Sequence, residues 1–464
     1  MSNGNSGRGR AVVLGGSIAG LVAARVLADS FDEVVVVERD RLPGGAEHRR
    51  GTPQARHVHA ILAGGQQALE QLYDGLTAEL TDLGAPVGDM LGDVRVYFGG
   101  HRQCGGPSGL VGVHVSRPAL EACLRTRVRA MPSVTLLDQC DAAGLTVTPE
   151  GTVVTGARII SRADGSAEET LVADLVVDAT GRLSRVPASL EALGYGRPPI
   201  ERVEIGVGYA SRTYRLGRDA LGGDLGILVG ATPDHPRGGA LAAVEGDRGL
   251  LTLFGILGDH PPTDPVGFEE FAASLQFPDI HETMRRVQPL DDPVAFRHPA
   301  SVRHRYERLR RFPDGLLVMG DAVCTFNPIY GQGMSVAALQ GLALRRHLAE
   351  PEGPRPVEFL REVGRIVDLP WGMASGGDLA FPGVEGRRTV GMRVLGAYVN
   401  RLQAGAAHDA RLGRAFLRVA GLVDPPQALL RPGVVARALR PRRSPGTPAP
   451  GSPADRRATQ EARS

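Results

Sequence analysis

Lysine is absent from this chain: among its 464 residues, all 53 basic side chains are arginines. Without a lysine the protein can form no Schiff base and has no P-loop ammonium, which excludes pyridoxal-phosphate enzymes and Walker-type nucleotidases. Net charge is also nearly absent, at +2 for the whole chain at pH 7. We therefore expect no nucleic-acid partner, because no global basic field attracts one.

Cysteines and long apolar runs are scarce as well. The four cysteines, Cys104, Cys123, Cys140 and Cys324, form no C-x-x-C pair, which excludes zinc ribbons and thioredoxin-like motifs, and we expect no metal site. Such scattered cysteines are typical of reduced thiols, so we expect a cytoplasmic protein. Beyond residue 30 no run of about 18 uninterrupted apolar residues occurs, and we expect no transmembrane segment.

The chain does have the composition of a globular protein, with 42% hydrophobic and 22% charged residues. Its length predicts two to four domains of about 100–200 residues each. We expect a flexible tail at 1–10, a nucleotide-binding domain at 11–195 with strands near 92–116 that belong to the next domain, an inserted antiparallel sheet at 196–305, a return to the first domain at 306–350, a helical region with Pro and Gly breaks at 351–440, and a disordered tail at 441–464.

The first motif is a glycine turn between a strand at 11–14 and a helix at 18–28. Residues 15–20 read GGSIAG, which matches G-x-G-x-x-G except that Ser17 takes the second glycine position. Gly15 suits the tight turn, Gly20 suits close helix–strand packing, and the helix N-terminus suits a pyrophosphate. Glu38 ends the second strand, where a carboxylate binds ribose hydroxyls. An arginine followed by apolar residues also fits a signal peptide, but the glycines and Glu38 favour the nucleotide site.

Two later motifs follow buried strands. The strand at 174–178 leads into Ala179-Thr180-Gly181, and the strand at 315–320 ends at Asp321. The loop after Asp321, N-P-I-Y-G-Q-G at 327–333, opens a helix predicted over 333–350. Asp321 can accept a hydrogen bond from a sugar-alcohol hydroxyl, and the positive end of the helix favours negative charge in front of it.

These three motifs, in this order, resemble the FAD-dependent monooxygenases of the para-hydroxybenzoate hydroxylase fold, the group A flavoprotein monooxygenases. The resemblance covers about residues 10–345. It implies an α/β fold: a Rossmann-like FAD-binding domain of GR2 type, an inserted antiparallel β-sheet domain for substrate, and a C-terminal helical region. The FAD site that it implies comprises Gly15, Ser17, Gly20, Glu38, Arg39, Arg117, Ala142, Asp321, Pro328, Gly331, Gly333, Met334 and Ser335.

Three further stretches, at 51–59, 207–214 and 369–383, look more like bacterial epoxidases of polyether biosynthesis, distant relatives of squalene epoxidase. This likeness implies epoxidation of an alkene in a polyketide-like natural-product intermediate, as in antibiotic biosynthesis. The family's reaction inserts one oxygen atom from O2 through a flavin C4a-hydroperoxide. The sequence shows no distinctive acid/base pair, which a phenol hydroxylase needs to activate its ring. We therefore expect an apolar polyene or aromatic substrate, with the alkene favoured.

Candidate catalytic residues are His57, His59 and Tyr209. In this fold the chain after the second strand passes the flavin ring, which would bring the two histidines near it; a structural role for both remains the alternative. Tyr209 and Arg212 lie on the inserted sheet and face opposite sides of their strand, so at most one of them lines the pocket.

Several alternatives stay open. Aromatic hydroxylases of this fold usually carry Asp-Gly where this chain has Thr180-Gly181, and that pair is tied to their use of NAD(P)H. Electrons would therefore come from NAD(P)H directly or through a partner flavin reductase. An aromatic hydroxylase is the main alternative function, followed by a FAD-dependent reductase of isoprenoid double bonds and a non-catalytic FAD-binding partner. A tryptophan-type halogenase is excluded because it needs a lysine.

Overall fold

The computed structural model describes residues 8–162, 167–217, 219–351 and 353–440. A five-stranded parallel sheet forms the centre of the first domain, because its strands are almost continuous apolar runs that are buried on both faces. Its strands lie in the order β18 (Leu316–Val318), β11 (Leu175–Asp178), β1 (Arg8–Leu14), β2 (Phe31–Val37) and β7 (Val134–Leu137). Strand β1 begins three residues before the predicted start, since the backbone of Arg8 and Arg10 pairs with β2. The rest of the predicted N-terminal tail, and the predicted tail at 441–464, lie outside the described residues.

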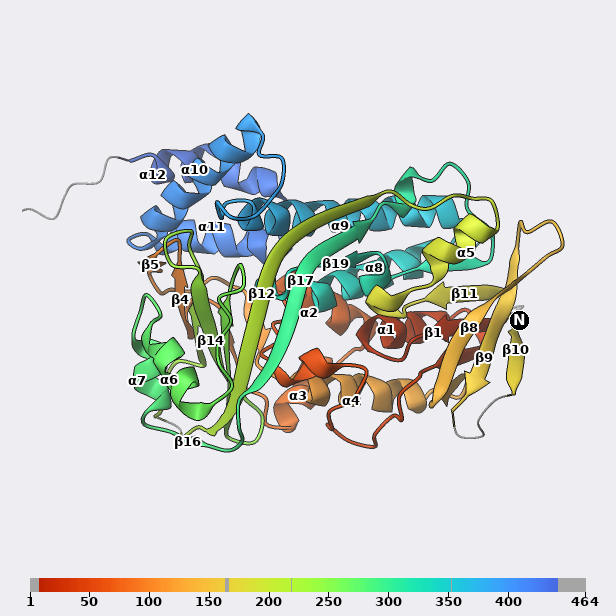
Figure 1. The fold of residues 1–464 in the computed structure, drawn as a ribbon, viewed down its shortest axis with the longest axis horizontal. Coiled ribbons are helices and arrows are strands. Elements are labelled where there is room, and N and C mark those ends of the chain that lie inside the picture. The colour runs from red at the N-terminus through yellow and green to blue at the C-terminus, as the bar shows by residue number, and fades with distance from the viewer. Residues whose placement is uncertain (1–7, 163–166, 218, 352, 441–464) are drawn as a thin grey trace, which may run out of the picture.

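Helices cover this parallel sheet, and a small antiparallel sheet flanks it. The helices are α1 (Ile18–Leu27), α2 (Ala63–Leu72), α3 (Leu76–Asp82), α4 (Arg117–Arg129), α5 (Val186–Ala192) and α8 (Gly333–Leu348). The flanking sheet has the order β10 (Glu168–Val172), β9 (Val154–Ser161) and β8 (Cys140–Val147). Figure 1 shows this sheet at the end of the molecule that lies farthest from α10.

The second domain is built on a nine-stranded sheet. Its order is β19 (Cys324–Thr325), β17 (Val294–His304), β12 (Ile200–Arg215), β15 (Arg248–Gly255), β14 (Arg237–Val244), β13 (Gly226–Val229), β4 (Val94–Phe98) and β5 (His101–Arg102), with β16 (Gln288–Pro289) also on β12. Two helices pack beside it, α6 (Pro265–Ala273) and α7 (Asp279–Met284). All neighbouring strands pair antiparallel except β13 and β4, which run parallel. The long strands β12 and β17 run between the two domains (Figure 1).

The strands expected near 92–116 divide between two sheets. β4 and β5 join the nine-stranded sheet as expected, whereas β6 (Val111–Val113) pairs with β3 (Val87–Asp89) in a separate two-stranded ribbon. The intervening residues 103–110 contain three glycines and a proline, which turn the chain away from the larger sheet.

The C-terminal region is helical. It comprises α9 (Pro356–Asp378), α10 (Val390–Ala406), α11 (Ala410–Ala420), the short helix η6 (Pro426–Leu430) and α12 (Pro432–Ala438). Helix α9 continues through Pro370 instead of breaking there, because its buried face, which includes Phe359, Val363 and Val367, packs against the core. We call α10, α11, η6 and α12 the C-terminal lobe; Figure 1 shows it beside β4 and β5. No helix among the described residues has the length and apolar character that crossing a bilayer demands.

Candidate functional site

A single cavity of about 1350 Å³ extends from the glycine turn after β1 to the C-terminal lobe. This exceeds the roughly 300–1,000 Å³ of a typical single-ligand pocket. Its wall falls into two parts. We call the part formed by residues 14–63, 117, 140–189 and 320–337 the cofactor limb, and the part formed by residues 90–110, 209–298 and 369–430 the chamber.

The glycine turn lies at one end of the cofactor limb. Gly15 has a φ of +104°, and a Cβ there would lie 2.5 Å from the carbonyl oxygen of Ala179. A Cβ on Gly20 would lie 1.7 Å from the carbonyl oxygen of Gly15. Only glycine therefore permits this close approach of β1, α1 and β11. The turn leaves the N-terminus of α1 facing the cavity, where its unpaired N–H groups suit a phosphate.

Glu38 lies beside this turn, at the end of β2. Its Oε2 accepts the N–H of Gly16 at 2.8 Å, and its Oε1 accepts the N–H of Asp40 at 2.9 Å. Arg49 lies 3.3 Å from Oε2. A carboxylate oxygen has two acceptor positions, so Glu38 can accept further hydrogen bonds from the hydroxyls of a ribose.

Ser17, which replaces the second glycine, is held by two charged side chains. Its hydroxyl donates to Glu121 Oε2 at 2.9 Å and accepts from Arg117 Nη2 at 3.1 Å. Glu121 Oε1 lies 2.6 Å from Arg49 Nη2. A continuous polar network therefore joins the glycine turn to the loop that carries Arg49.

The same network reaches the loop of His57 and His59. His59 Nδ1 lies 2.9 Å from the carbonyl oxygen of His57, and His59 Nε2 lies 3.3 Å from Arg117 Nη1. A carbonyl only accepts and a guanidinium only donates, so the proton of a neutral His59 is on Nδ1. Burial, and then the charge of Arg117, lower the pKa of His59 to about 3. Neutral His59 is therefore a hydrogen-bond partner of Arg117.

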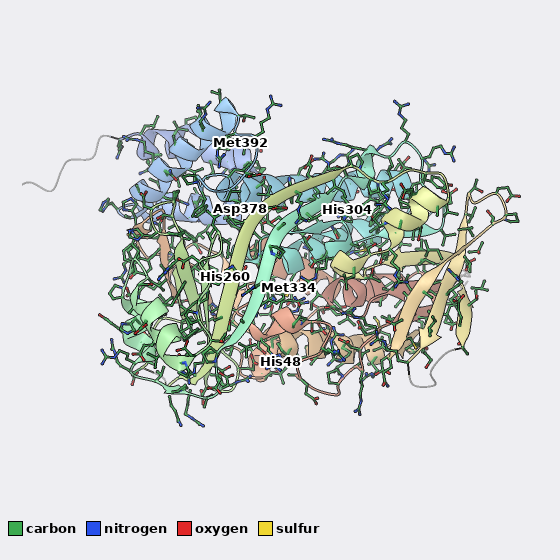
Figure 2. The ribbon with its side chains drawn as sticks, in the orientation of Figure 1. His48, His260, His304, Met334, Asp378 and Met392 are labelled. Carbon is green, nitrogen blue, oxygen red and sulfur yellow. The ribbon has the colours of Figure 1, made fainter. Side chains whose placement is uncertain are left out.

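The late motif also contributes to the wall of the cofactor limb. Strand β18 ends at Val318, a short turn begins at Gly320, whose φ is +65°, and Asp321 in this turn lines the cavity. Desolvation inside the cavity raises the pKa of the Asp321 carboxyl, while the charges of Arg117 and Arg182 lower it. The loop through Gly331, whose φ is +66°, delivers the N-terminus of α8 to the cavity. Figure 2 shows Met334, in the first turn of α8, near the centre of the molecule.

Most of the predicted site residues line this one cavity. They are Gly15, Ser17, Glu38, Arg39, Arg117, Ala142, Asp321, Pro328, Gly331, Gly333, Met334, His57, His59 and Tyr209. Gly20 and Ser335 are not part of its wall. Gly20 packs beneath the turn, and the Ser335 hydroxyl accepts the N–H of Leu62 at 2.9 Å, which ties α8 to the chain before α2.

The chamber differs from the cofactor limb in charge. Among the described residues, the cofactor limb contains five carboxylates and five arginines, whereas the residues assigned to the chamber include no Asp, Glu or Arg. Arg182 of the cofactor limb lies at the boundary, 5.8 Å from the ring centroid of Phe296. Its wall consists of aliphatic and aromatic side chains, glycines and a few neutral polar groups, including Phe254, Phe296 and Asn400. The chamber therefore suits an uncharged, mainly apolar molecule.

His57 lies where the chamber meets the cofactor limb. Its Nδ1 lies 2.7 Å from Ser211 Oγ, which lies 2.5 Å from Thr252 Oγ1. Its ring centroid is 5.7 Å from that of Tyr209 and 5.6 Å from that of Phe296. Burial, and then the charge of Arg56, lower the pKa of His57 to about 4. At neutral pH His57 is uncharged and is a weak base.

Sequence reasoning missed a second buried polar group beside the chamber. Asp378, at the end of α9, is fully buried, and its Oδ1 accepts from Asn327 Nδ2 at 2.8 Å and from the Tyr330 hydroxyl at 3.0 Å. Burial raises the pKa of Asp378 to about 6. Asp378 thus anchors the loop before α8, and Figure 2 shows it between Met334 and the C-terminal lobe. Burial also raises the pKa of the Tyr209 hydroxyl, with Asp378 adding to the shift.

The signals for these missed residues were weak. Asn327 and Tyr330 belong to the late motif, but nothing in the sequence pairs them with Asp378, 48 or more positions away. Arg49 and Glu121 likewise come from separate segments and meet only in the folded chain. Asp378, Arg49 and Glu121 share one feature, a charged side chain at a buried position. Hydrophobic periodicity alone does not reveal such a position.

The residues of the cofactor limb fit FAD. The buried Arg117 Nε has no hydrogen-bond partner among the described residues, and the carboxylates of Glu38 and Asp321 both line the cavity. Two helix N-termini, those of α1 and α8, face the same space, and each favours a negative group. A dinucleotide, with its hydroxyls and negatively charged pyrophosphate, can use these donors, acceptors and helix ends.

Comparison with known proteins gives three similar curated sequences and many similar structures, although no protein-family model matches the chain. Protein Rv3254 of Mycobacterium tuberculosis is 33% identical over 442 residues, which cover 92% of this chain and 93% of that protein. Kynurenine 3-monooxygenase of Salinispora arenicola is 29% identical over 353 residues, covering 72% of this chain and 71% of the enzyme.

Solved structures share the fold at lower identity. The flavin-dependent brominase Bmp2 superposes with a TM-score of 0.65 and 14% identity, covering 89% of this chain and 92% of that one. The p-nitrophenol 4-monooxygenase PnpA of Pseudomonas putida gives a TM-score of 0.62 and 16% identity, covering 89% of this chain and 98% of that one. The chain therefore belongs to the same family as Rv3254, and its fold is that of the group A FAD-dependent monooxygenases.

Proposed function

We propose that the protein is a FAD-dependent monooxygenase that epoxidises an alkene in an uncharged, apolar, polyketide-like molecule. One observation carries the proposal: the cavity that offers a dinucleotide site opens directly into a chamber without charged side chains among the described residues. When bound and reduced, FAD supplies the activation of O2. The overall reaction converts the alkene, O2, reduced nicotinamide and a proton into the epoxide, water and oxidised nicotinamide.

The chain's own residues would bind the cofactor and orient the substrate. Arg117 and the N-terminus of α1 would hold the pyrophosphate, Glu38 the ribose, and Asp321 the ribityl chain, while α8 would direct its positive end at the flavin ring. The apolar chamber wall would exclude water and hold the alkene beside that ring.

The weak basicity of the histidines that face the chamber favours an alkene over a phenol. A phenol, whose pKa is about 10, needs a base to raise its electron density. His57 and His298 face the chamber, and burial lowers the pKa of each to about 4. Transfer of a phenolic proton to such an imidazole is uphill by about 8 kcal/mol. An alkene needs no such transfer.

Hydroxylation of an aromatic ring is the second candidate, because the curated relative from Salinispora arenicola is a kynurenine 3-monooxygenase. Kynurenine itself is an amino acid that carries both charges, and the residues of the described chamber wall include no carboxylate to pair with its ammonium group. A neutral, electron-rich aromatic molecule would be compatible with that wall.

The purified protein provides the test. We expect it to bind FAD with a yellow colour and to accept electrons anaerobically from NADPH, either directly or only after a separate flavin reductase is added. Oxygen and a panel of polyenes and neutral phenols would follow, with mass spectrometry to detect one added oxygen atom. An epoxide supports the proposal, and a ring hydroxyl supports the second candidate. Reduction of the alkene without oxygen uptake, or a protein that is colourless because it binds no FAD, would contradict both candidate functions.

A further inference from the structure

The C-terminal part of the chain carries a charge opposite to that of the rest. Residues 385–464 contain 15 arginines and five acidic residues, whereas residues 1–384 contain 38 arginines and 46 acidic residues. In residues 385–440, which the structure describes, ten arginines accompany three acidic residues. Only Arg411, Arg418 and Arg437 of these ten form ion pairs within the described residues. The C-terminal lobe is therefore strongly cationic.

This lobe also exposes aliphatic side chains. Val390, Val394 and Leu395 at the start of α10 are 69%, 66% and 56% exposed, and Leu430 of η6 is 62% exposed. We call these four residues the apolar rim. The buried residues of α10, such as Leu402, all lie in its second half, so its first two turns project from the protein. Clustered exposed aliphatic side chains mark a surface that is covered in use.

The apolar rim borders the mouth of the cavity. Leu395 and Leu430 belong to the rim and also line the chamber, together with Met392. Figure 2 shows Met392 at the outer edge of the C-terminal lobe, beyond Asp378 and Met334. Exposed apolar side chains of the lobe therefore continue into the chamber wall, whose own residues include no charged side chain.

We propose that the C-terminal lobe docks on an anionic lipid bilayer, with the apolar rim inserted among the acyl chains and the surrounding arginines on the lipid headgroups. Docking in this way opens the chamber to the apolar interior of the bilayer, from which the substrate enters. The docking follows from the surface itself, whereas the entry of substrate rests on the proposed function.

Charge and shape favour a bilayer over the other occupants. Two copies of this chain that met face to face through the rim would bring two cationic lobes together, and these repel. An acidic protein would match the arginines, but it would have to close the cavity mouth in order to cover the rim. A bilayer matches both features, because anionic headgroups attract arginines and acyl chains solvate aliphatic side chains at the same depth.

Vesicle binding of the full-length, FAD-loaded protein tests the inference. Vesicles of phosphatidylcholine with one quarter phosphatidylglycerol are compared with vesicles of phosphatidylcholine alone, by flotation at physiological salt. We expect binding to the anionic vesicles. V394D/L395D should weaken it at least about tenfold, and removal of one charge in R393Q should weaken it about fivefold.

A matched control introduces two aspartates at exposed valines outside the C-terminal lobe. Val172 of β10 and Val266 of α6 are 65% and 68% exposed, and V172D/V266D should bind vesicles like the unchanged protein. The inference is overturned if the unchanged protein stays unbound, if the control variant loses binding equally, or if an acidic protein rather than vesicles binds the rim. It is also overturned if V394D/L395D dissociates a dimer seen by sedimentation velocity. Because no turnover is measured, a protein that docks but oxidises nothing contradicts only the proposed function.

Discussion

The two parts of the cavity differ in the charge of their walls. In the cofactor limb, charged side chains are numerous, balanced in sign and tied together, as in the network of Ser17, Glu121 and Arg49. In the chamber, the residues of the described wall include no charged side chain. Its His298, and His57 at its boundary with the cofactor limb, are neutral because burial lowers the pKa of each to about 4. One cavity wall thus combines a charged part and an apolar part, which differ in polarity.

The largest effect should come from a side chain added to the glycine turn of the cofactor limb. In G20A the new Cβ would lie 1.7 Å from the carbonyl oxygen of Gly15, so α1 would have to move away from β1. We expect FAD affinity to fall by more than about a hundredfold, measured by quenching of flavin fluorescence. In G45A the added Cβ meets no atom within 4 Å, and this control should bind FAD normally. Normal FAD binding by G20A would contradict the placement of the pyrophosphate.

Removal of the central cation should have the next largest effect. Arg117 donates to Ser17 and contacts His59, and its unpaired Nε is available to a phosphate. We expect R117Q to weaken FAD binding by about 2–3 kcal/mol, because a charge-assisted hydrogen bond contributes about that much. The control R129Q changes an exposed arginine on the same helix and should leave the affinity unchanged. Equal losses in the two variants would assign the effect to helix stability.

The neutral histidines of the chamber predict a loss of stability in acid. In the unfolded chain the imidazole of His57 has a pKa of 6.5, whereas in the folded protein its pKa is about 4. Its contribution is therefore complete above pH 6.5 and is lost as the pH falls toward 4. By pH 5 we expect a cost of about 2 kcal/mol in the free energy of unfolding from this histidine. Urea titrations at pH 7 and pH 5 should show a smaller difference for H57Q, and an unchanged difference would mean that His57 is charged in the folded protein.

The smallest effect should come from one charge placed in the chamber. Leu228 of β13 lines it, and L228D would put a carboxylate against the substrate, whereas L228N has nearly the same shape without the charge. We expect L228D to bind the substrate found in the screen at least about tenfold more weakly than L228N, with unchanged FAD affinity in both. If the two variants bind that substrate equally well, the absence of charge in the chamber is not what selects the substrate.

The parallel sheet and the turns on it could be predicted because their signals are local. Four consecutive valines end β2, the glycines after β1 favour a tight turn, and Asp321 comes three residues after the buried strand β18. Chain neighbours decide these features, so a pattern in the sequence is enough. The start of β1 was misjudged because pairing with β2, rather than side-chain hydrophobicity, extends it to Arg8.

The polar groups inside the protein could not be predicted in the same way. Nothing in the sequence distinguishes Asp378 from an exposed aspartate at the end of a helix, and its partner Asn327 lies 51 positions away. The motif that contains Ser17 was recognised, but its bonds to Glu121 and Arg117 cross about 100 residues. Likewise, the role of His57 at the edge of the chamber depends on Ser211, which β12 supplies from the second domain.

The sequence by itself determined the βαβ start, the order of the three motifs and the opposite charges of the two parts of the chain, because these depend on residues adjacent or summed along it. Only the tertiary structure decided that the motifs enclose one cavity, that its far part is free of charge among the described residues, and that the cationic lobe lies at its mouth. The physical reason is that the burial and the local polarity of a residue depend on its neighbours in space. Distant segments of the chain provide those neighbours only when it is folded.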